Sequence, residues 1–329
     1  MWEKLCPPLI VVLLLPIGSP FAQEKKTSKL FKIGVVQFFP GQTFDKDQNG
    51  FEKALADAGF REKLHVLYDR QNAQGKLANV QAITQKFLVE KFDLIHSMTT
   101  PVSQEVVKLV RNTPVVFSAV TDPVGAGLVP QNSRPWEKSG TNVTGVSHRC
   151  PVDLQFEMYT RFVPKARKWG TIYNAGDQNT LIFIRDMRGA AKKLGIELIE
   201  AVISFPDETL QATQFIAGKV QALHILDDPT AVSAWDAIVK VCNEKKIPLF
   251  ASDVESVPKG AIAAYGVNFF SIGYSAGKKA ARILKGVEPG SIPWGRVENL
   301  FLVVSEKAAK EQGVIIPPAL LKKSDKVIH

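Results

Sequence analysis

The sequence has very little cysteine, with only Cys6, Cys150 and Cys242 among its 329 residues. It contains no paired cysteines at metal-ligand spacing and no H-x-x-x-H motif, so the usual signatures of a zinc site are absent. A Walker A lysine motif is also missing. We therefore expect no metal and no nucleotide cofactor. We expect Cys150 and Cys242 to be free, buried thiols, although an oxidising compartment would permit a disulfide between them.

Long hydrophobic runs are equally scarce, and the clearest is short and close to the amino terminus. Lys4 precedes an apolar run at residues 9–15, and a small-residue exit ends at Ala22. The run is too short to span a bilayer, which favours a secretory signal peptide over residues 1–22 rather than a retained anchor. Cys6 precedes the run, which argues against a lipid-anchored cysteine. We expect an exported, periplasmic or otherwise extracytoplasmic protein.

The charge balance is basic, with 41 Lys and Arg against 32 Asp and Glu and a net charge of +9. These cations are scattered along the chain, and no basic region with interleaved aromatic residues occurs, so we expect no nucleic-acid partner. A composition with 45% hydrophobic and 22% charged residues is ordinary for a globular protein. The length after the leader predicts about two domains.

Apolar strands alternate with amphipathic helices along most of the chain. Strands are predicted at 32–38, 64–68, 92–98 and 113–120, and helices at 47–60 and 75–91. Thr100 and Pro101 begin a further helix. After a loop-rich interval at 130–148, which we interpret as a domain boundary, Pro151 begins a helix. Strands then follow at 168–174, 196–203, 222–227, 247–252 and 261–267. The alternation predicts an α/β fold with parallel sheets.

Two short motifs imitate ligand sites but are incomplete. The glycines around Ala126 begin like a dinucleotide-binding loop, but the third glycine position is Pro130. The segment after Asp45 resembles half of a calcium loop, but Ala56 occupies the position of the bidentate glutamate. A polar helix start is the better interpretation of the second motif.

A third motif, at residues 273–277, matches the G-x-S-x-G nucleophile elbow of hydrolases, with Ser275 at its centre. That fold places its acid and its base after the serine, and the only later histidine is His329, the last residue. Small residues at a tight helix contact explain the match better. The remaining histidines are isolated, and among them His96 and His148 lie close to predicted strand ends that could line a cleft.

Polar loops follow the carboxyl ends of the predicted strands in both halves of the chain. In open α/β sheets ligands bind at these ends, and two lobes that face each other would bring the loops together. Hydroxyl groups and helix N-termini suit a carboxylate, whereas aspartates suit an ammonium group. Helix capping is the alternative role for such residues. The loops are 38–41, 97–101, 121–122, 174–179, 227–230 and 252–253.

A set of segments in the same order over nearly all of the chain resembles the substrate-binding proteins of ABC importers with a type I periplasmic-binding fold. The branch is the one that includes tryptophan and other aromatic amino-acid binders. The resemblance implies two Rossmann-like lobes, with parallel sheets flanked by helices, joined by three crossings. Lobe 1 would comprise 28–146 and 267–293, and lobe 2 would comprise 147–266 and 294–329. The matching segments include KIGVVQF, YDRQNAQG, DLIHSMTTPVSQ, PVVFSAVTDPVGAGLV, GTNVTGVS, IYNAGDQN and AARILKG.

The resemblance also implies a division of roles at the ligand. Thr99, Thr100 and Thr121 would bind a carboxylate, Asp253 and the 174–179 loop would receive an amino group, and Phe38 and Phe39 would cover an apolar or aromatic side chain. The chain departs from the family pattern at 226–229, at Asn268 and near Asn174, which leaves the ligand open. The full candidate set is Phe38, Phe39, Thr99, Thr100, Thr121, Asp122, Asn174, Asp177, Asn179, Asp227, Asp228, Asp253 and Asn268.

The function implied is the capture of a small, amino-acid-like ligand and its delivery to an ABC importer permease, by a monomer without enzymatic activity. A ligand-sensing role beside a separate signalling receptor remains an alternative, and so does a hydrolase that uses Ser275. A cytoplasmic repressor shares the fold, but it needs an N-terminal DNA-binding helix pair where this chain has a leader.

Overall fold

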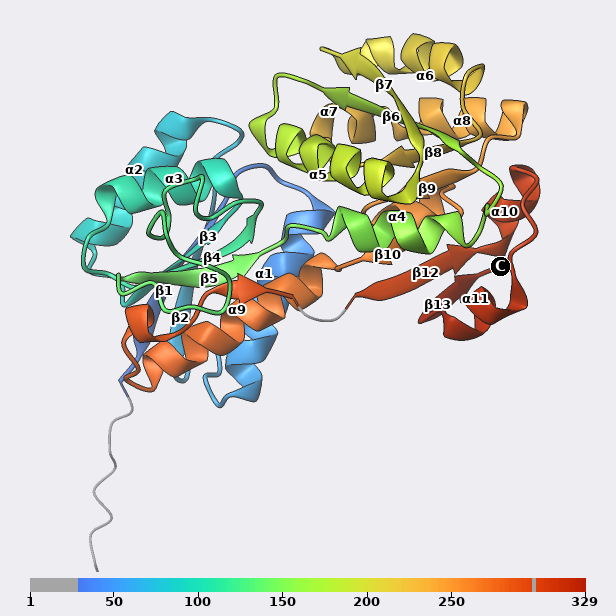
Figure 1. Cartoon of the computed structure of the whole chain (residues 1–329). Coiled ribbons are helices and arrows are strands. Elements are labelled where there is room, and N and C mark those ends of the chain that lie inside the picture. Colours follow the sequence, from blue (N-terminus) through green and yellow to red (C-terminus); the bar gives the residue numbers. More distant parts are fainter. Residues whose placement is uncertain (1–28, 298–299) are drawn as a thin grey trace, which may run out of the picture.

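The computed structural model describes residues 29–297 and 300–329, which form two α/β lobes side by side (Figure 1). The predicted signal peptide, residues 1–22, lies outside the described residues. The first lobe contains β1 (Phe31–Gln37), α1 (Gln42–Asp57), β2 (Val66–Asn72), α2 (Leu77–Val89), β3 (Leu94–Met98), α3 (Thr100–Leu109), β4 (Val115–Val120), β5 (Val143–Ser147), α9 (Phe269–Leu284), the 3-10 helix η3 (Pro289–Ser291) and β11 (Gly295–Arg296).

The second lobe repeats the strand-helix alternation, as the sequence pattern predicts. It contains α4 (Val152–Thr160), β6 (Lys168–Asn174), α5 (Gln178–Leu194), β7 (Glu197–Ile203), η1 (Pro206–Glu208), α6 (Thr209–Ala217), β8 (Ala222–Ile225), α7 (Pro229–Ser233), α8 (Trp235–Lys245), β9 (Leu249–Ala251), η2 (Val254–Lys259), β10 (Ala263–Gly266), β12 (Phe301–Ser305), α10 (Glu306–Glu311), α11 (Pro318–Lys323) and β13 (Lys326–Ile328).

The two sheets have the strand orders β11-β5-β4-β3-β1-β2 and β13-β12-β10-β9-β8-β6-β7. The paired strands are parallel, except that β12 runs antiparallel to β10. Three crossings join the lobes: β5 to α4, β10 to α9, and β11 to β12. The predicted fold class is therefore confirmed.

The first sheet extends slightly past the predicted lobe boundaries at 146 and 293. Gly295 and Arg296 pair with β5, so the first lobe continues beyond the predicted end at 293. The loop-rich interval at 130–148 holds β5, which lies in the first sheet, so this interval is not itself the boundary. The sequence pattern did not predict this strand because β5 is short, follows a long loop and contains few apolar residues.

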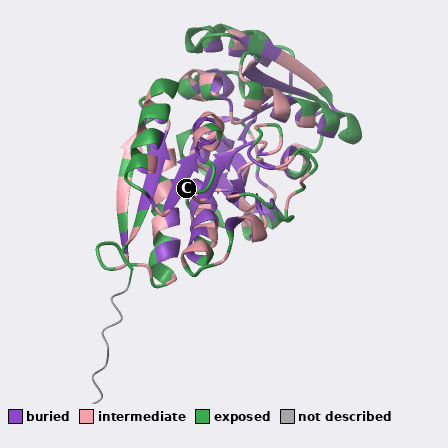
Figure 2. Ribbon diagram, turned by 90° about the vertical axis from the view of Figure 1, so that its left-hand side faces the viewer, coloured by how far each residue is buried: buried purple, intermediate pink, exposed green. Residues whose placement is uncertain are grey.

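Each sheet is covered on both faces, which explains the continuous apolar runs of its strands. Ile33 and Val35 of β1 pack on the side of α1 and α9, whereas the next residue, Val36, packs on the side of α2 and α3. Figure 2 shows the buried strands between helices whose outer faces are exposed. These packed sheets fix the strand ends from which the site is built.

Helices α1 and α9 pack so closely that side chains are excluded from the contact. A Cβ atom added at Gly273 or Gly277 would overlap the carbonyl oxygen of Asp47 or Phe51, and one at Gly50 would overlap that of Phe270. The interpretation of the G-x-S-x-G match as a small-residue packing motif is thus confirmed.

A buried polar network joins α1, β3 and β4 beneath this contact. Ser118 Oγ donates to Asp47 Oδ1 at 2.8 Å and lies 2.8 Å from His96 Nε2, and the His96 ring stacks on Phe51. Burial raises the pKa of Asp47 to about 8 and lowers that of His96 to about 3. Asp47 and His96 are therefore both neutral near pH 7. His96 lies in the core of the first lobe and not at the ligand face.

We expect Asp47→Asn to change how the free energy of unfolding depends on pH. The folded carboxyl keeps its proton up to about pH 8, whereas the unfolded carboxyl loses it near pH 4, so wild type loses stability as pH rises between these values. The neutral amide has no such dependence. The difference in stability should therefore shift toward the variant by more than about 1 kcal/mol between pH 5 and 8, measured by urea unfolding. A difference that stays constant over this range would show that Asp47 is ionised.

Candidate functional site

The carboxyl ends of the strands in the two sheets face each other, and polar contacts connect them. Thr100 Oγ1 lies 3.4 Å from Asn179 Oδ1, and Lys46 Nζ lies 3.3 Å from Glu255 Oε1. At the first crossing, His148 Nε2 lies 3.4 Å from Asp227 Oδ2. We call this region the interlobe site; it comprises Lys46, Thr99, Thr100, Thr121, His148, Asn179, Asp227, Asp253 and Glu255.

The first lobe contributes hydroxyl groups that lack protein partners. Thr99 is the N-cap of α3, but its side chain makes no capping hydrogen bond, and its backbone has φ of +79°. Its Oγ1 and that of Thr121 are buried, and neither has a hydrogen-bond partner among the described residues. A buried hydroxyl without a protein partner is costly, so both groups are candidates for contact with a ligand.

The backbone is irregular at the ends of β3 and β4, and this irregularity sets the orientation of the two threonines. The pairing of β4 with β5 shifts register after Phe117, and Ala119 has φ of +52°. Such a bulge redirects the residues that follow it, and here Thr121 follows. Thr99 also holds a positive φ, which is unfavourable for a β-branched residue. The N-terminus of α3 adds a partial positive charge beside both hydroxyls. Together these groups form a receptor suited to a carboxylate.

The second lobe contributes three carboxylates, Asp227, Asp253 and Glu255. Burial, together with the negative charges of Asp227 and Glu255, raises the pKa of Asp253 to about 6, against a hydrogen bond donated by Ser256. Glu255 Oε2 is buried without a hydrogen-bond partner among the described residues. Carboxylates crowded together in this way are complementary to a cationic group such as an ammonium.

A metal ion is a poorer match for these carboxylates. Within the part of the chain that the structure describes, no three His, Cys, Asp or Glu side chains are arranged to hold a metal ion. The predicted absence of a metal remains an expectation, but the geometry favours an organic cation.

Aromatic rings lie on both sides of the site. Phe38 and Phe39 follow β1 and contact each other edge to face, with ring centroids 4.5 Å apart. Phe39 is half exposed and lies over Gly75, where a Cβ would overlap its ring. At the crossing, the His148 ring lies about 6 Å from the rings of Phe183 and Phe269. Phe39 offers exposed apolar surface, whereas Phe183 and Phe269 are buried in the cores of the two lobes.

Several of the predicted ligand residues have a structural role instead, because their own helices use their side chains. Asp177 caps α5 through Thr180 N and Asn268 caps α9 through Ser271 N. Asp122 accepts from Gly125 N within its own turn. These three residues sit at strand ends, as predicted, but their side chains stabilise the local backbone.

Asp228 and Asn174 are engaged even more completely. Asp228 is fully buried, and its two oxygens accept from Ala231 N, Asn174 N and Thr180 Oγ1. The Asn174 side chain bonds Gly176 N, Ser204 O and Thr230 Oγ1. Both residues therefore have a structural role in the second lobe, and a role for them in ligand binding stays a prediction.

Sequence reasoning missed Lys46 and Glu255, and it noted His148 only as a histidine near a strand end. Lys46 lies in the first turns of α1 and Glu255 lies in η2, so nothing local indicates that their charges meet. Their residue types carry no motif. The only usable signal for Glu255 was its position two residues after Asp253.

Both cysteines are buried and free, which confirms the expectation for them. Cys150 packs in the core of the first lobe and Cys242 in that of the second, so they cannot meet. Burial raises the pKa of each thiol to about 12. Neither thiol is a candidate nucleophile.

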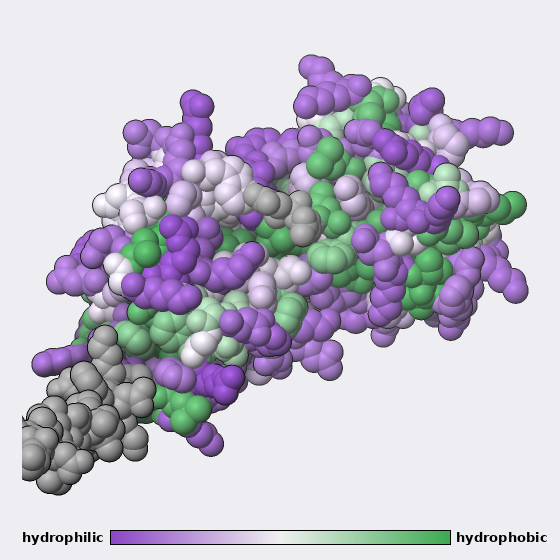
Figure 3. All heavy atoms as spheres, turned by 90° about the horizontal axis from the view of Figure 1, so that it is seen from below, coloured by the Kyte–Doolittle hydropathy of each residue, from purple (hydrophilic) through white to green (hydrophobic). Residues whose placement is uncertain are grey.

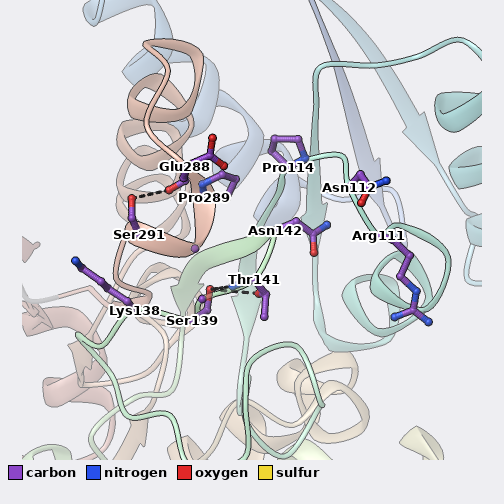
Figure 4. Close-up of a pocket in the computed structure, with 12 residues that line it drawn as sticks. Arg111, Asn112, Pro114, Lys138, Ser139, Thr141, Asn142, Glu288, Pro289 and Ser291 are labelled. Atoms are coloured by element: carbon purple, nitrogen blue, oxygen red, sulfur yellow. Dashed lines mark hydrogen bonds between the residues drawn. The ribbon is translucent and has the colours of Figure 1, made fainter.

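A hollow of about 680 Å³ lies at the opposite, amino-terminal end of the first sheet. Two pairs of its lining residues bond to each other: Ser291 Oγ donates to Glu288 O, and Thr141 Oγ1 donates to Ser139 Oγ (Figure 4). Arg111 and Lys138 lie at opposite sides of this hollow in Figure 4 and do not converge on one point. We assign it no ligand.

The surface is mixed in character. On the face seen in Figure 3, hydrophilic side chains cover much of both lobes and separate the hydrophobic patches. Over residues 29–297 and 300–329, no helix has both the length and the apolar character needed to cross a bilayer.

Comparison with known proteins agrees with this architecture. A family model described as ABC transporter substrate binding protein matches residues 32–328. The tyrosine-binding protein of Clostridioides difficile is 36% identical over 296 residues, covering 89% of this chain and 85% of that protein. A crystal structure of a conserved domain protein from Vibrio cholerae superposes with a TM-score of 0.81 at 33% identity, covering 91% of this chain and all of that one. An ABC domain from Streptococcus pneumoniae in complex with L-Trp superposes with a TM-score of 0.80 at 27% identity and the same coverage. The chain belongs to the family of ABC transporter substrate-binding proteins.

Proposed function

We propose that this protein binds an aromatic L-amino acid, tyrosine or tryptophan, at the interlobe site and presents it, outside the cytoplasm, to an ABC importer permease. The observation that carries the proposal is the pairing of two opposite receptors. Unpartnered hydroxyls of Thr99 and Thr121 lie on one lobe, and the carboxylates of Asp227, Asp253 and Glu255 lie on the other. An α-amino acid carries the matching carboxylate and ammonium on adjacent atoms.

The aromatic preference rests on the rings beside the site and on the relatives. Phe38 and Phe39 follow β1 and would cover the ligand side chain, and Phe39 is half exposed. Two similar proteins are described as binding tyrosine or L-Trp. Aromatic side chains bury a large apolar area, which supplies affinity beyond the polar contacts.

Binding would close the two lobes because the ligand contacts both of them. A ligand shifts a conformational equilibrium by its difference in affinity for the two states, and only the closed state lets the hydroxyls and the carboxylates bind one molecule together. The contacts from Lys46 to Glu255 and from Thr100 to Asn179 would then add to the closed state. We propose that no bond is made or broken and that the protein acts as a monomer.

The first test is isothermal titration of the purified protein with tyrosine, tryptophan and two analogues of tyrosine. Tyramine lacks the carboxylate and 4-hydroxyphenylpropionate lacks the amine, so each engages only one receptor. We expect at least one of the two amino acids to bind, and either analogue to bind at least about a hundredfold more weakly, since each leaves buried polar groups unpaired. If tyramine bound as tightly as tyrosine, the threonines would not be the receptor for the carboxylate. If no amino acid bound, the proposal would be rejected.

We further expect the affinity for the amino acid to depend on pH through Asp253. The ammonium group favours the carboxylate form, and in the free protein the Asp253 carboxyl has a pKa of about 6. Affinity should therefore be constant between pH 7 and 8 and should fall by up to about tenfold per unit below pH 6. Near pH 6 binding should release a proton, which titrations in buffers of different ionisation enthalpy detect. Affinity that is constant from pH 5 to 8 would contradict the role of Asp253.

A further inference from the structure

A second hollow, of about 600 Å³, lies beside the third crossing between the lobes. One wall is the outer face of α9, where Phe270, Tyr274 and Lys278 follow one another at helical spacing, and another wall is Trp136. Phe301, the first residue of β12, lines it from the second lobe. We call it the hinge pocket. It is separate from the interlobe site, because none of the residues of that site lines it.

Four cationic side chains line the hinge pocket, and no carboxylate among the described lining residues offsets them. They are Lys278, Lys279, Arg282 and Arg296. None of the four forms an ion pair with a described residue. Among the carboxylates, Asp186 has the largest effect on the pKa of Arg296. Its oxygens already accept hydrogen bonds from the Arg149 guanidinium at 2.6–2.9 Å.

Two of these cations, Lys279 and Arg296, are partly buried. Arg296 Nε is buried and makes no hydrogen bond to any described residue. Lys279 donates to Pro293 O, and burial together with the charges of Arg282 and Lys278 lowers its pKa to about 8. Like charges held close together repel one another, and a bound anion would relieve this repulsion.

The aromatic wall of the pocket is built at a conformational cost. Trp136 holds φ of +72°, a rare conformation for a bulky residue, and its ring covers Gly295, where a Cβ would overlap it. Half of the Trp136 side chain remains exposed. Across the pocket, the rings of Phe270 and Tyr274 lie parallel, 6.1 Å apart. A strained, exposed indole is a reason to look for a function.

We propose that the hinge pocket binds a small organic anion with a flat aromatic ring, whose acidic group meets the Lys278, Arg282 and Arg296 cations and whose ring lies against Trp136. The chemistry differs from that of the interlobe site, because the described residues that line this pocket are cationic and aromatic, whereas carboxylates lie at the interlobe site. Aromatic acids without an amine fit this pocket, and aromatic amino acids fit the other site.

The test is isothermal titration of the purified protein with indole-3-acetate, with and without saturating tyrosine. We expect one probe per chain and no displacement by tyrosine. The paired change Lys278→Gln with Arg282→Gln should weaken binding by at least about tenfold, and Trp136→Ala should do the same. Lys285→Gln, which removes a charge just beyond α9 outside the pocket, should leave the affinity unchanged.

Each contrary outcome overturns a defined part of the proposal. Displacement of indole-3-acetate by tyrosine would place the probe at the interlobe site. If Lys285→Gln lost as much affinity as the paired Lys278 and Arg282 variant, the effect would come from the net charge of the protein and not from the pocket. Inorganic phosphate that binds as tightly as the probe, with no effect of Trp136→Ala, would reject the aromatic part. If tyrosine itself does not bind, the titration without tyrosine and the variants still decide the question.

Discussion

Asp253→Asn should weaken binding of the aromatic amino acid by about a hundredfold or more. Asp253 is the most strongly perturbed carboxylate of the interlobe site, and an ammonium ligand would replace the repulsion from Asp227 and Glu255 with attraction. The amide keeps the size of the side chain but carries no charge, so a buried ionic contact is lost. Removal of one partner from such a contact costs about 3–5 kcal/mol. Isothermal titration at pH 7.5 measures the effect.

A matched control separates this local effect from a change in overall charge. Asp236→Asn removes an exposed carboxylate in the first turn of α8, in the same lobe, and should leave the affinity unchanged. If Asp253→Asn binds as wild type does, Asp227 would have the ammonium role, and Asp227→Asn should then show the loss. Asp228 is a weaker alternative, because its oxygens already accept hydrogen bonds within the second lobe.

Gly273→Ala should destabilise the protein by about 3 kcal/mol, a large effect for a single methyl group. The new Cβ would overlap the carbonyl oxygen of Asp47, a backbone atom that cannot move unless α1 moves away from α9. Overpacking of this kind typically costs 1–3 kcal/mol, and rigid backbone on the opposite side places this position at the upper end. Thermal and urea unfolding measure the loss.

Gly189→Ala is the matched control for the same chemical change. Gly189 lies in the exposed part of α5, and a Cβ there meets no atom within 4 Å. Alanine is a better helix former than glycine, so this variant should be stabilised by about 0.5–1 kcal/mol. If both variants lost the same stability, the cost would come from glycine-specific backbone freedom rather than from the α1–α9 contact.

The sequence predicted the strands and helices closely where local signals were strong. The apolar run at 168–174 is β6, and Gly195 ends α5 in the left-handed conformation that favours glycine. The signals failed where a strand is short and its pairing is distant. The pairing of β11 with β5 joins segments about 150 residues apart, and no local pattern in two residues records it.

The candidate site shows the same limit at the level of single side chains. Asp228 and Asp253 both follow apolar strands of the second lobe, and their residue type gives the same prediction for each. Three donors surround Asp228 in the folded chain, whereas Asp253 has a single serine donor and two nearby carboxylates. Capping and ligand binding use the same atoms, so only the neighbours in space distinguish them.

By itself, the sequence determined the α/β class, the two lobes and the strand ends where a ligand would bind, because hydrophobic periodicity and turn residues are local properties. It also determined that Ser275 lies in a small-residue motif. Only the tertiary structure decided which polar side chains remain free. It left the Thr99 and Thr121 hydroxyls without partners, engaged Asp177, Asp228 and Asn268 in capping, and brought Lys46 to Glu255 across 209 residues. The physical reason is that hydrogen bonding and charge repulsion depend on distance in space, which the order of residues does not record.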